Sequence, residues 1–526
     1  MESQAVFLMQ RNDPIEVLAT LVPAKDYKHP EVQDVMEQEL QKWKTFSVYD
    51  LVEDAGQEAI DGRWIIQKKD DHDSLKVNLK ARYCLRGFKE ENKPRSDSPT
   101  VDRMSTKLLY AITAQMKGWV LESIDVTAAF LQGGELDRDI YVIPPKEANN
   151  EGFLWKMKKA AYGLCDASRR WFVRVVEFLL SLGGKTMIGD ECVIYFHKDG
   201  YLRGMVTIHV DDFQSEGNPY FRKNVMDKLA AEFKISKREI GKFKYTGVHV
   251  EHCSDGSIII NQESYKESLE MIDIDVKDDM DRSLNKKEYK QFRGAAGKLS
   301  WLSDMTRPDL AFDSVELSGH NKDAKVRDIK SMNKLLDRAK KNAGKIRFGK
   351  VTDDIKNAKI LAVCDASHLR REEKTKGVMG RFLFLSNQEE TKVCPIGWKS
   401  KTIATVCKSA KSAETRSADK CIEEAVYVAR CMKELITGER GWSQLDVDLR
   451  TDSKSLIDSI DSSRQIDDKL LRPTIKWMKQ MLDAKQVRSI RWVDGTSCIA
   501  DILTKPGAPL TQTTMDILEL GDMIDM

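Results

Sequence analysis

The chain has 526 residues, of which 41% are hydrophobic and 32% are charged, with a formal net charge of +2. This length exceeds what one hydrophobic core supports and predicts roughly three or four domains or subdomains. No apolar run approaches a membrane span, and the first residues lack the basic and then apolar plan of a signal peptide, so we expect an intracellular protein. Ten cysteines without a CxxC pair argue against a disulfide framework or a structural zinc site.

Hydrophobic periodicity and turn residues divide the first half of the chain into helices and strands. The predicted helices cover residues 30–46, 104–117 and 167–182, and the predicted strands cover residues 62–67, 78–87, 119–126, 140–143 and 202–210. This mixed order of helices and hairpins is typical of an α+β fold.

In the second half, two segments are weakly periodic and are predicted as linkers, at residues 273–285 and 344–357. Beyond them we expect strands at residues 358–365, 377–385, 395–398 and 446–452, and a helix from about residue 413 to residue 436. Acidic residues stand at the ends of several of these elements. The pattern predicts a separate C-terminal α/β unit.

Two adjacent carboxylates, Asp211 and Asp212, follow the apolar segment 202–210 and precede turn residues at 215–219. We therefore place them at the tip of a hairpin. Neighbouring like charges repel unless a cation neutralises them, and a divalent metal ion is the usual cation at such a pair. A solvated loop is the alternative interpretation of this pair taken alone.

Asp125, at the end of the predicted strand 119–126, supplies a possible partner for the pair. Strand-borne acids that converge at one end of a sheet can hold two Mg²⁺ ions, which align an attacking 3′-hydroxyl and a departing pyrophosphate. The motifs around these acids resemble those of copia-type LTR retrotransposon reverse transcriptases. The resemblance rests on residues 80–88 (KARYCLRGF), 124–134 (IDVTAAFLQGG), 154–164 (LWKMKKAAYGL) and the Asp211-Asp212 hairpin, and it covers nearly the whole chain.

The resemblance implies roles for residues of the first site. Asp125 and Asp211 would be the principal metal ligands, and Asp212 would complete the acidic pair. Phe130 would lie beneath the incoming sugar and exclude a 2′-hydroxyl; an ordinary core aromatic is the alternative. The remaining candidates would contact the nucleotide: Lys80, Arg82 and Arg86 at the triphosphate, and Tyr162 and Gly163 at the nucleotide and template.

The chain departs from the family at two places near this site. His209 stands where the family usually has an aromatic residue that contacts the primer, and a half-buried strand residue is the alternative interpretation. Residues 165–169 replace a more polar, proline-containing stretch, which affects the details of template contact.

A second acidic set, Asp365, Glu414, Asp452 and Asp501, follows the D-E-D-D pattern of ribonuclease H. In that enzyme two metal ions activate water against an RNA phosphodiester. The resemblance rests on residues 363–367 (VCDAS), 397–401 (GWKSK), 412–414 (SAE), 450–453 (RTDS) and 500–506 (ADILTKP). Each acid alone is more typical of a surface residue, whereas all four in order indicate a nuclease. Residues 469–472 replace a histidine-containing stretch of the family.

Residues 325–350 have a strong basic excess on a mostly helical pattern, with Lys325, Lys330, Lys334, Arg338 and Lys341 as candidate nucleic-acid contacts. A solvated helix face explains the same pattern. By the resemblance, this helix would follow an RNA/DNA duplex through backbone charge, without contacts to bases. A second basic set, which includes Lys68 and Lys76, carries the same two interpretations.

These observations predict a right-hand polymerase of α+β class followed by a ribonuclease H-like α/β domain with a mixed sheet. The predicted parts are an N-terminal extension (1–46), fingers and palm (47–255), thumb or connection (256–357), the nuclease (358–506) and a mobile tail (507–526).

The predicted function is RNA-directed DNA polymerisation with RNA strand hydrolysis. The resemblance implies two Mg²⁺ ions per site, with Mn²⁺ as a substitute. It also implies RNA template, DNA primer, RNA/DNA hybrid and deoxynucleoside triphosphates as partners, and location in cytoplasmic virus-like particles or the nucleus; homo-oligomerisation is left open. The rival hypothesis is an inactive or host-adopted nucleic-acid-binding remnant of such an element.

Overall fold

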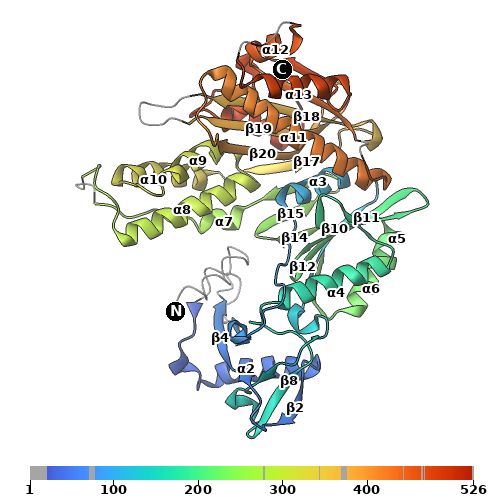
Figure 1. Ribbon diagram of the computed structural model, residues 1–526, viewed down its shortest axis with the longest axis vertical. Helices are drawn as coiled ribbons and strands as arrows, with labels where there is room; N and C mark the ends of the chain where they lie inside the picture. The colour runs from blue at the N-terminus through green and yellow to red at the C-terminus, as the bar shows by residue number, and fades with distance from the viewer. Residues whose placement is uncertain are drawn as a thin grey trace.

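The computed structural model describes residues 20–69, 78–275, 279–342, 344–368, 376–441, 444–463, 466 and 468–523. Within these residues the strands form five sheets. Two small sheets and a helix lie at the bottom of Figure 1, a larger sheet with helices lies above them, and the C-terminal sheet lies at the top. A group of helices extends to one side, next to the C-terminal unit.

The lower part of the molecule corresponds to the predicted fingers. Helix α2 (Pro30–Thr45) packs Trp43 against Tyr83 and Trp155, whose rings lie 5.9 and 5.4 Å from it. One sheet has the order β1-β4-β5, with β1 Thr20–Leu21, β4 Gly62–Lys69 and β5 Asn78–Leu85. The other has the order β2-β8-β7-β3, with β2 Tyr49–Glu53, β8 Phe153–Met157, β7 Tyr141–Val142 and β3 Ala59–Ile60. Lys76 lies outside the described residues.

The larger sheet has the order β13-β6-β12-β11-β10-β9 and corresponds to the predicted palm. Its strands are β6 Val120–Val126, β9 Lys185–Met187, β10 Asp190–Lys198, β11 Tyr201–His209, β12 Asp212–Gly217 and β13 Ile235–Ile240. The turn predicted at residues 215–219 begins later than expected, because β12 continues to Gly217. Short helices follow it: α5 Pro219–Phe221 and α6 Asp227–Glu232.

The two faces of this sheet are covered differently because side chains alternate along each strand. Ile124 and Phe213 point to the face covered by α4 (Ala167–Ser181), where Trp171 and Leu179 complete the core. The opposite face meets α3 (Arg103–Thr113), whose Tyr110 hydroxyl donates a 2.6 Å hydrogen bond to the Gln214 side chain.

Next in the chain is a sheet with the order β14-β15-β16-β17: β14 Lys242–Tyr245, β15 Val248–His252, β16 Ile258–Asn261 and β17 Lys345–Phe348. The linker predicted at residues 344–357 is therefore wrong, because β17 pairs with β16 and its Ile346 and Phe348 are buried. The strand has only four residues, too few for its alternation of charged and apolar side chains to stand out in the sequence.

Helices inserted between β16 and β17 form the predicted thumb: α7 Glu263–Glu267, α8 Lys286–Met305, α9 Ala311–Gly319 and α10 Val326–Lys341. Their shared core contains Phe292, Leu299 and Leu336. Of the linker predicted at residues 273–285, residues 276–278 lie outside the described residues. Its end is structured, because the Asn285 side chain caps α8 and Glu288 completes a capping box.

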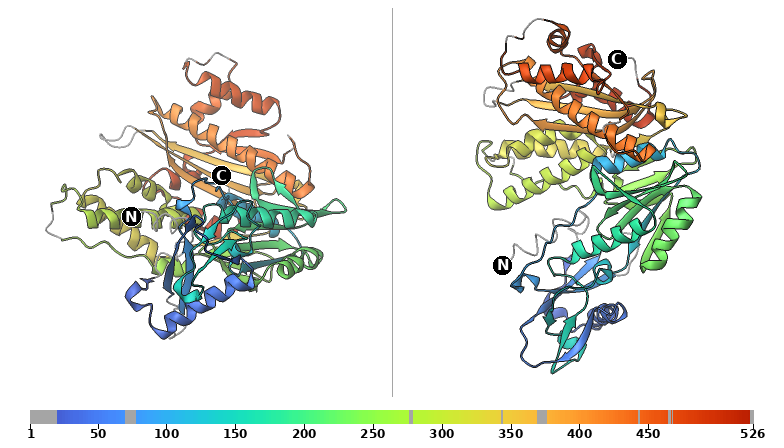
Figure 2. Two further views of the ribbon diagram at one scale, coloured as in Figure 1. Left: turned by 60° about the horizontal axis from the view of Figure 1, so that its bottom comes forward. Right: turned by 45° about the vertical axis from the view of Figure 1, so that its right-hand side comes forward.

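The C-terminal sheet has the order β20-β19-β18-β21-β22. Its elements are β18 Lys359–Ser367, β19 Val378–Ser386, β20 Val393–Thr402, α11 Ala410–Thr437, β21 Asp446–Thr451, α12 Lys454–Asp461, α13 Arg472–Asp483 and β22 Ser489–Trp492. Strand β18 pairs antiparallel with β19 and parallel with β21, so the predicted mixed sheet is confirmed. Helix α11 crosses this sheet (Figure 2).

One hydrophobic core runs through several of the predicted parts. It joins Leu121 of the palm sheet, Phe348 of β17, Val363 of the C-terminal sheet and Leu518 near the C-terminus. Helix α3 lies between the palm and the C-terminal sheet in Figures 1 and 2. The prediction of a mobile tail is wrong for residues 511–520, which form α14 (Thr511–Leu520) with buried Ile517 and Leu518.

Polar contacts reinforce the junction of these parts. The ammonium group of Lys107 on α3 lies 3.3 Å from the centre of the Trp398 ring and donates a 2.7 Å hydrogen bond to the Asp304 main-chain oxygen. Burial lowers the pKa of Lys107 to about 7, despite the opposing effect of the Asp304 carboxylate. Among the described residues, no helix is long and apolar enough to cross a membrane.

Candidate active sites

The Asp211-Asp212 pair lies at the tip of the β11–β12 hairpin, as predicted. The turn residue Val210 has a φ of 59°, which is unfavourable for a β-branched residue and is held by its surroundings. The Trp171 indole donates a 2.7 Å hydrogen bond to the Val210 main-chain oxygen, and the Val126 main-chain amide donates a 3.1 Å hydrogen bond to the Asp211 main-chain oxygen. These bonds fix the tip against α4 and β6.

The three acids of the first predicted site lie at the same end of the palm sheet. Asp125 is directly opposite Asp212 in the antiparallel register of β6 and β12, so both side chains stand on one face. Burial raises the pKa of Asp211, and the Asp125 carboxylate adds to that effect, whereas Arg82 and Lys80 lower it. The acids therefore repel one another, and two basic residues of the fingers lie close enough to reduce this repulsion.

Ser236 on β13 is a contact that the sequence did not indicate. Its hydroxyl donates hydrogen bonds to the carboxylate and, at 3.1 Å, to the main-chain oxygen of Asp125. The edge strand β13 pairs with β6, so its Ser236 hydroxyl positions the Asp125 carboxylate. No local pattern could have revealed this, since the two residues are 111 positions apart.

A cavity of 240 Å³ joins this acidic tip to the fingers. Four of the predicted nucleotide contacts, Arg82, Phe130, Tyr162 and Gly163, line it together with Asp211. The other two predicted contacts are not among the lining residues. The Arg86 guanidinium is bonded to Asp61 at 2.7 Å, and Lys80 is near enough to lower the pKa of Asp211.

The wall of the cavity is built from aromatic and backbone contacts. The Phe130 and Tyr162 rings lie 5.6 Å apart, and the Arg82 guanidinium lies 5.6 Å from the Tyr162 ring centre. Gly163 has a φ of +94°, and a Cβ there would lie 2.0 Å from the Leu85 oxygen. Only glycine fits this position, because the loop presses directly on strand β5.

His209 is the last residue of β11 and is directly opposite Asp212. Its ring lies 6.4 Å from the Tyr245 ring in an edge arrangement, and the side chain is half-buried. Both interpretations of His209 therefore remain compatible with its position next to the acidic tip.

Helix α10 exposes the basic face that its sequence predicted, while Ile329, Leu335 and Leu336 are buried against the other helices. Three of the five predicted contacts have acidic partners: Lys325 with Asp281, Arg338 with Asp313 and Lys341 with Asp337, at 3.3, 2.7 and 2.6 Å. Lys330 and Lys334 are exposed. The positive potential of this face is therefore weaker than the residue count suggests.

The second predicted set of acids converges at one end of the C-terminal sheet. Asp365 is in β18, Glu414 is in α11, Asp452 follows β21, and Asp501 is in the short 3₁₀ helix at Ile499–Leu503. One carboxylate oxygen from each of Asp365, Glu414 and Asp452 lies within 4.8 Å of the others. The structure brings together all four acids, because Asp501 lies within the same limit of Asp452.

The protonation of these acids reflects their crowding. Burial, with the charges of Asp365 and Asp452, raises the pKa of Glu414 to about 9. Burial and Asp365 raise the pKa of Asp452 to about 6, and burial also raises that of Asp501. Within the part of the chain that the structure describes, the buried Glu414 Oε2 atom has no hydrogen-bond partner. A divalent cation fits this cluster, because it would satisfy that oxygen and offset the repulsion.

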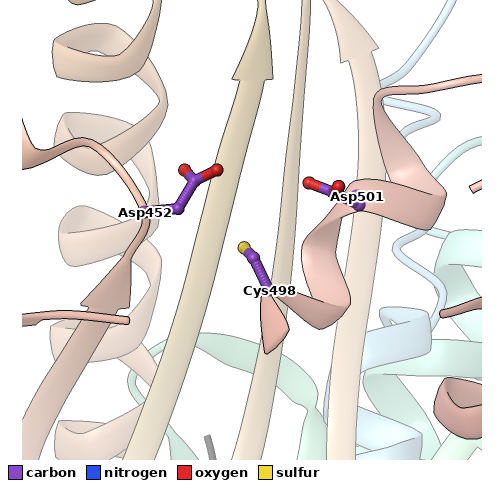
Figure 3. Close-up of side chains that lie close together, drawn as sticks. All are labelled: Asp452, Cys498 and Asp501. Atoms are coloured by element: carbon purple, nitrogen blue, oxygen red, sulfur yellow. The ribbon is translucent and has the colours of Figure 1, made fainter. Parts of the chain in front are cut away.

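Three residues around these acids were not predicted to take part. Lys505 lies 2.6 Å from Asp501 and 3.6 Å from Asp365, and Thr504 donates a hydrogen bond to Asp365. Burial alone would lower the pKa of Lys505, but Asp365 and Asp501 raise it. The thiol of Cys498 lies within 4.8 Å of carboxylate oxygens of Asp452 and Asp501 (Figure 3). Lys505 lies in the same motif as Asp501, residues 500–506. This closeness in sequence was the only signal that could have pointed to Lys505 as part of the site.

Comparisons with known proteins agree with this architecture. The family described as "Reverse transcriptase (RNA-dependent DNA polymerase)" matches residues 44–278. The solved structure of the foamy viral protease-reverse transcriptase dRH in complex with ds DNA has a TM-score of 0.52 at 11% identity, over 88% of this chain and 69% of that chain. The fold is that of a right-hand polymerase, followed here by a ribonuclease H-like domain.

The sequence relatives define the family more narrowly. The chain is 24% identical over 393 residues to the Retrovirus-related Pol polyprotein from transposon RE1 of Arabidopsis thaliana, covering 71% of this chain and 26% of the relative. It is 24% identical over 513 residues to that from transposon TNT 1-94 of Nicotiana tabacum, covering 91% and 37%. Residues 44–278 thus belong to the reverse transcriptases, and the predicted relationship to copia-type LTR retrotransposon Pol proteins is confirmed. The chain spans about a quarter to a third of these relatives' length.

Proposed function

We propose that this chain is an RNA-directed DNA polymerase of a copia-type element with C-terminal ribonuclease H activity. The observation that carries the polymerase proposal is the placement of Asp125 opposite Asp212, with Asp211 at the hairpin tip beside a fingers cavity. Asp125 and Asp211 would hold the metal ions of this site. Two Mg²⁺ ions per site would activate the attacking oxygen and stabilise the leaving group, and Mn²⁺ would substitute.

The residues of the cavity bind and orient the incoming deoxynucleoside triphosphate in this proposal. Arg82, with Lys80 nearby, neutralises phosphate charge, as both already lower the pKa of Asp211. Phe130 and Tyr162 form the wall against which the sugar and base lie. The side chain of Phe130 would exclude a 2′-hydroxyl and so favour deoxynucleotides.

In the nuclease, Asp365, Glu414, Asp452 and Asp501 would hold the metal ions and direct water against the RNA strand of a hybrid. The unpartnered Glu414 Oε2 supports this, because a buried carboxylate oxygen without a partner is unfavourable unless a ligand completes it. Lys505 and Thr504 orient Asp501 and Asp365. The retention of both sites favours the enzyme over a non-catalytic remnant.

Helix α8 adds a candidate duplex-binding surface that the sequence analysis did not single out. Gly294 and Gly297 are exposed inside this helix, and among the described residues a Cβ at either would meet no atom within 4 Å beyond the adjacent backbone of the helix itself. Glycine in a helix interior costs about 1 kcal/mol relative to alanine, so packing within the chain does not explain them. Close approach of a nucleic-acid backbone would, and Lys290 and Arg293 are exposed beside them.

A primer-extension assay on poly(rA)/oligo(dT) with Mg²⁺ or Mn²⁺ tests the polymerase. We expect incorporation by the wild type and its loss in Asp211→Asn. Template binding without incorporation, unchanged in that variant, would show that the chain is a binding remnant.

The nuclease has a separate test. Asp452→Asn should abolish cleavage of the RNA strand in a hybrid while sparing primer extension. If cleavage persists in this variant, the assignment of the second acidic set is wrong. The predicted boundaries of the domains, and any oligomer, remain proposals.

A further inference from the structure

The Cys498 side chain is fully buried and points toward the gap between the carboxylates of Asp452 and Asp501 (Figure 3). Its sulfur and one oxygen of each acid all lie within 4.8 Å of one another. This thiol donates a weak hydrogen bond, at 3.9 Å, to the Cys364 main-chain oxygen, and the Ala500 main chain also bonds to it. A thiol thus lies among carboxylate oxygens, whereas a site that binds Mg²⁺ alone needs only oxygen ligands.

A second observation indicates that this cluster lacks a ligand. Glu414 shares the neighbouring three-acid group with Asp452, only 9% of its surface is exposed, and among the described residues its Oε2 atom has no hydrogen-bond partner. Asp452 belongs to both groups, so the orphaned oxygen and the thiol lie in adjoining sets of ligand atoms. Sulfur in only one of the two groups makes them chemically different.

We propose that Cys498, Asp452 and Asp501 form a binding site for a thiophilic divalent cation such as Zn²⁺ or Cd²⁺, and that its occupancy blocks hybrid cleavage. Zinc combines cysteine sulfur and carboxylate oxygen in tetrahedral sites, whereas Mg²⁺ prefers oxygen and an octahedral shell. On binding, the S–H bond is replaced by a sulfur–metal bond, and the proton passes to solvent without any change of oxidation state.

A bound cation would offset most of the negative charge of its ligands. A thiolate and two carboxylates carry three negative charges, of which the divalent cation offsets two, and the Lys505 ammonium, 2.6 Å from Asp501, is shared with Asp365 at 3.6 Å. Neutrality matters because the residues are mostly buried, and an uncompensated charge there is strongly unfavourable. A soft cation at Asp452 and Asp501 would occupy two of the four acids on which the proposed nuclease depends.

The binding step can be tested without any enzymatic activity. The full-length, metal-free protein is titrated with Cd²⁺ while the ultraviolet thiolate-to-metal charge-transfer absorbance is recorded. We expect a saturable signal of one equivalent in the wild type, its loss in Cys498→Ser and its weakening in Asp501→Asn. The matched control is Cys394→Ser, which makes the same change at another buried cysteine of this sheet and should keep the signal.

A signal that survives in Cys498→Ser would overturn the proposal, because other thiols would then be the ligands. Circular dichroism and thermal unfolding verify that each variant is folded, and Cys498→Ala provides a second substitution if the serine variant is not. Loss of the signal in Cys394→Ser as well would equally contradict the assignment to Cys498.

The inhibitory consequence rests on the proposed nuclease function and has its own measurement. Zn²⁺ is titrated against hybrid cleavage in excess Mg²⁺, each variant being normalised to its own zinc-free rate. We expect the half-inhibitory Zn²⁺ concentration to rise at least ~10-fold in Cys498→Ser, the scale of losing one metal contact. Equal sensitivity would refute inhibition through Cys498. Absence of cleavage by the wild type would instead refute the nuclease, while the Cd²⁺ result stands.

Discussion

Replacing Glu414 by glutamine should stabilise the metal-free protein and remove hybrid cleavage at the same time. Glutamine resembles the protonated carboxyl group, so the variant lacks the penalty of ionising a buried acid. The pKa of Glu414 is raised from 4.5 to about 9, so the folded state binds the proton more tightly than the unfolded state. The stability of the wild type therefore falls as the pH rises from about 4.5 to about 9.

The magnitude follows from this shift. Each pH unit in the window corresponds to about 1.4 kcal/mol, and pH 7 lies 2.5 units above 4.5. The variant should exceed the wild type by about 1 kcal/mol at pH 5 and by at most about 3.5 kcal/mol at pH 7. Other titrating groups contribute to both proteins and largely cancel in the difference.

Thermal unfolding in EDTA at pH 5, 6 and 7 measures this difference, with hydrogen exchange of β18 and α11 as a local readout. The control is Glu423→Gln, an exposed glutamate on the same helix, which should change neither the stability nor its pH dependence. Mg²⁺ at a hundred times its Kd should narrow the difference at pH 7 by stabilising only the wild type, by about 2.7 kcal/mol. A difference that does not grow between pH 5 and pH 7 would refute the reasoning.

Three further predictions concern the polymerase and the junction. Phe130→Val should raise the use of ribonucleotides relative to deoxynucleotides at least ~10-fold in single-nucleotide incorporation, since it opens the cavity wall; an unchanged ratio would show that Phe130 is only a core residue. Gly297→Leu should leave thermal stability unchanged or higher and yet weaken template-primer binding. Gly319→Leu, at a similarly open position of α9, should not weaken this binding. Equal binding by both variants would exclude the α8 surface as a binding site. The lowered pKa of Lys107 makes the free energy of unfolding of the wild type rise by about 1.4 kcal/mol per pH unit between about 7 and 10.5. Lys107→Met should abolish this gain in unfolding experiments at pH 7 to 9. A gain that persists in the variant would show that Lys107 is not its cause.

Much of the fold could be predicted because the periodicity of the chain matches its burial. The apolar, β-branched runs before Asp125 and in residues 202–210 identified two palm strands, β6 and β11, and the helical spacing at 413–436 identified α11. Predictions failed where partners were distant. Strand β17 has only four residues, and its Ile346 and Phe348 are buried by packing into the core shared with Tyr110 and β20, while α14 is buried against β17; neither element is long enough to show these partners in its own sequence.

The sequence by itself determined which acids could act, because seven carboxylates stand at element ends within ordered motifs. Only the tertiary structure decided how they are arranged, since register places Asp125 opposite Asp212, and packing of the 3₁₀ helix brings Asp501 to Asp452. It also decided which other groups enter the sites. Ser236 joins Asp125, and Cys498 joins Asp452, through contacts between segments far apart in the chain, and such contacts leave no local periodicity in the sequence.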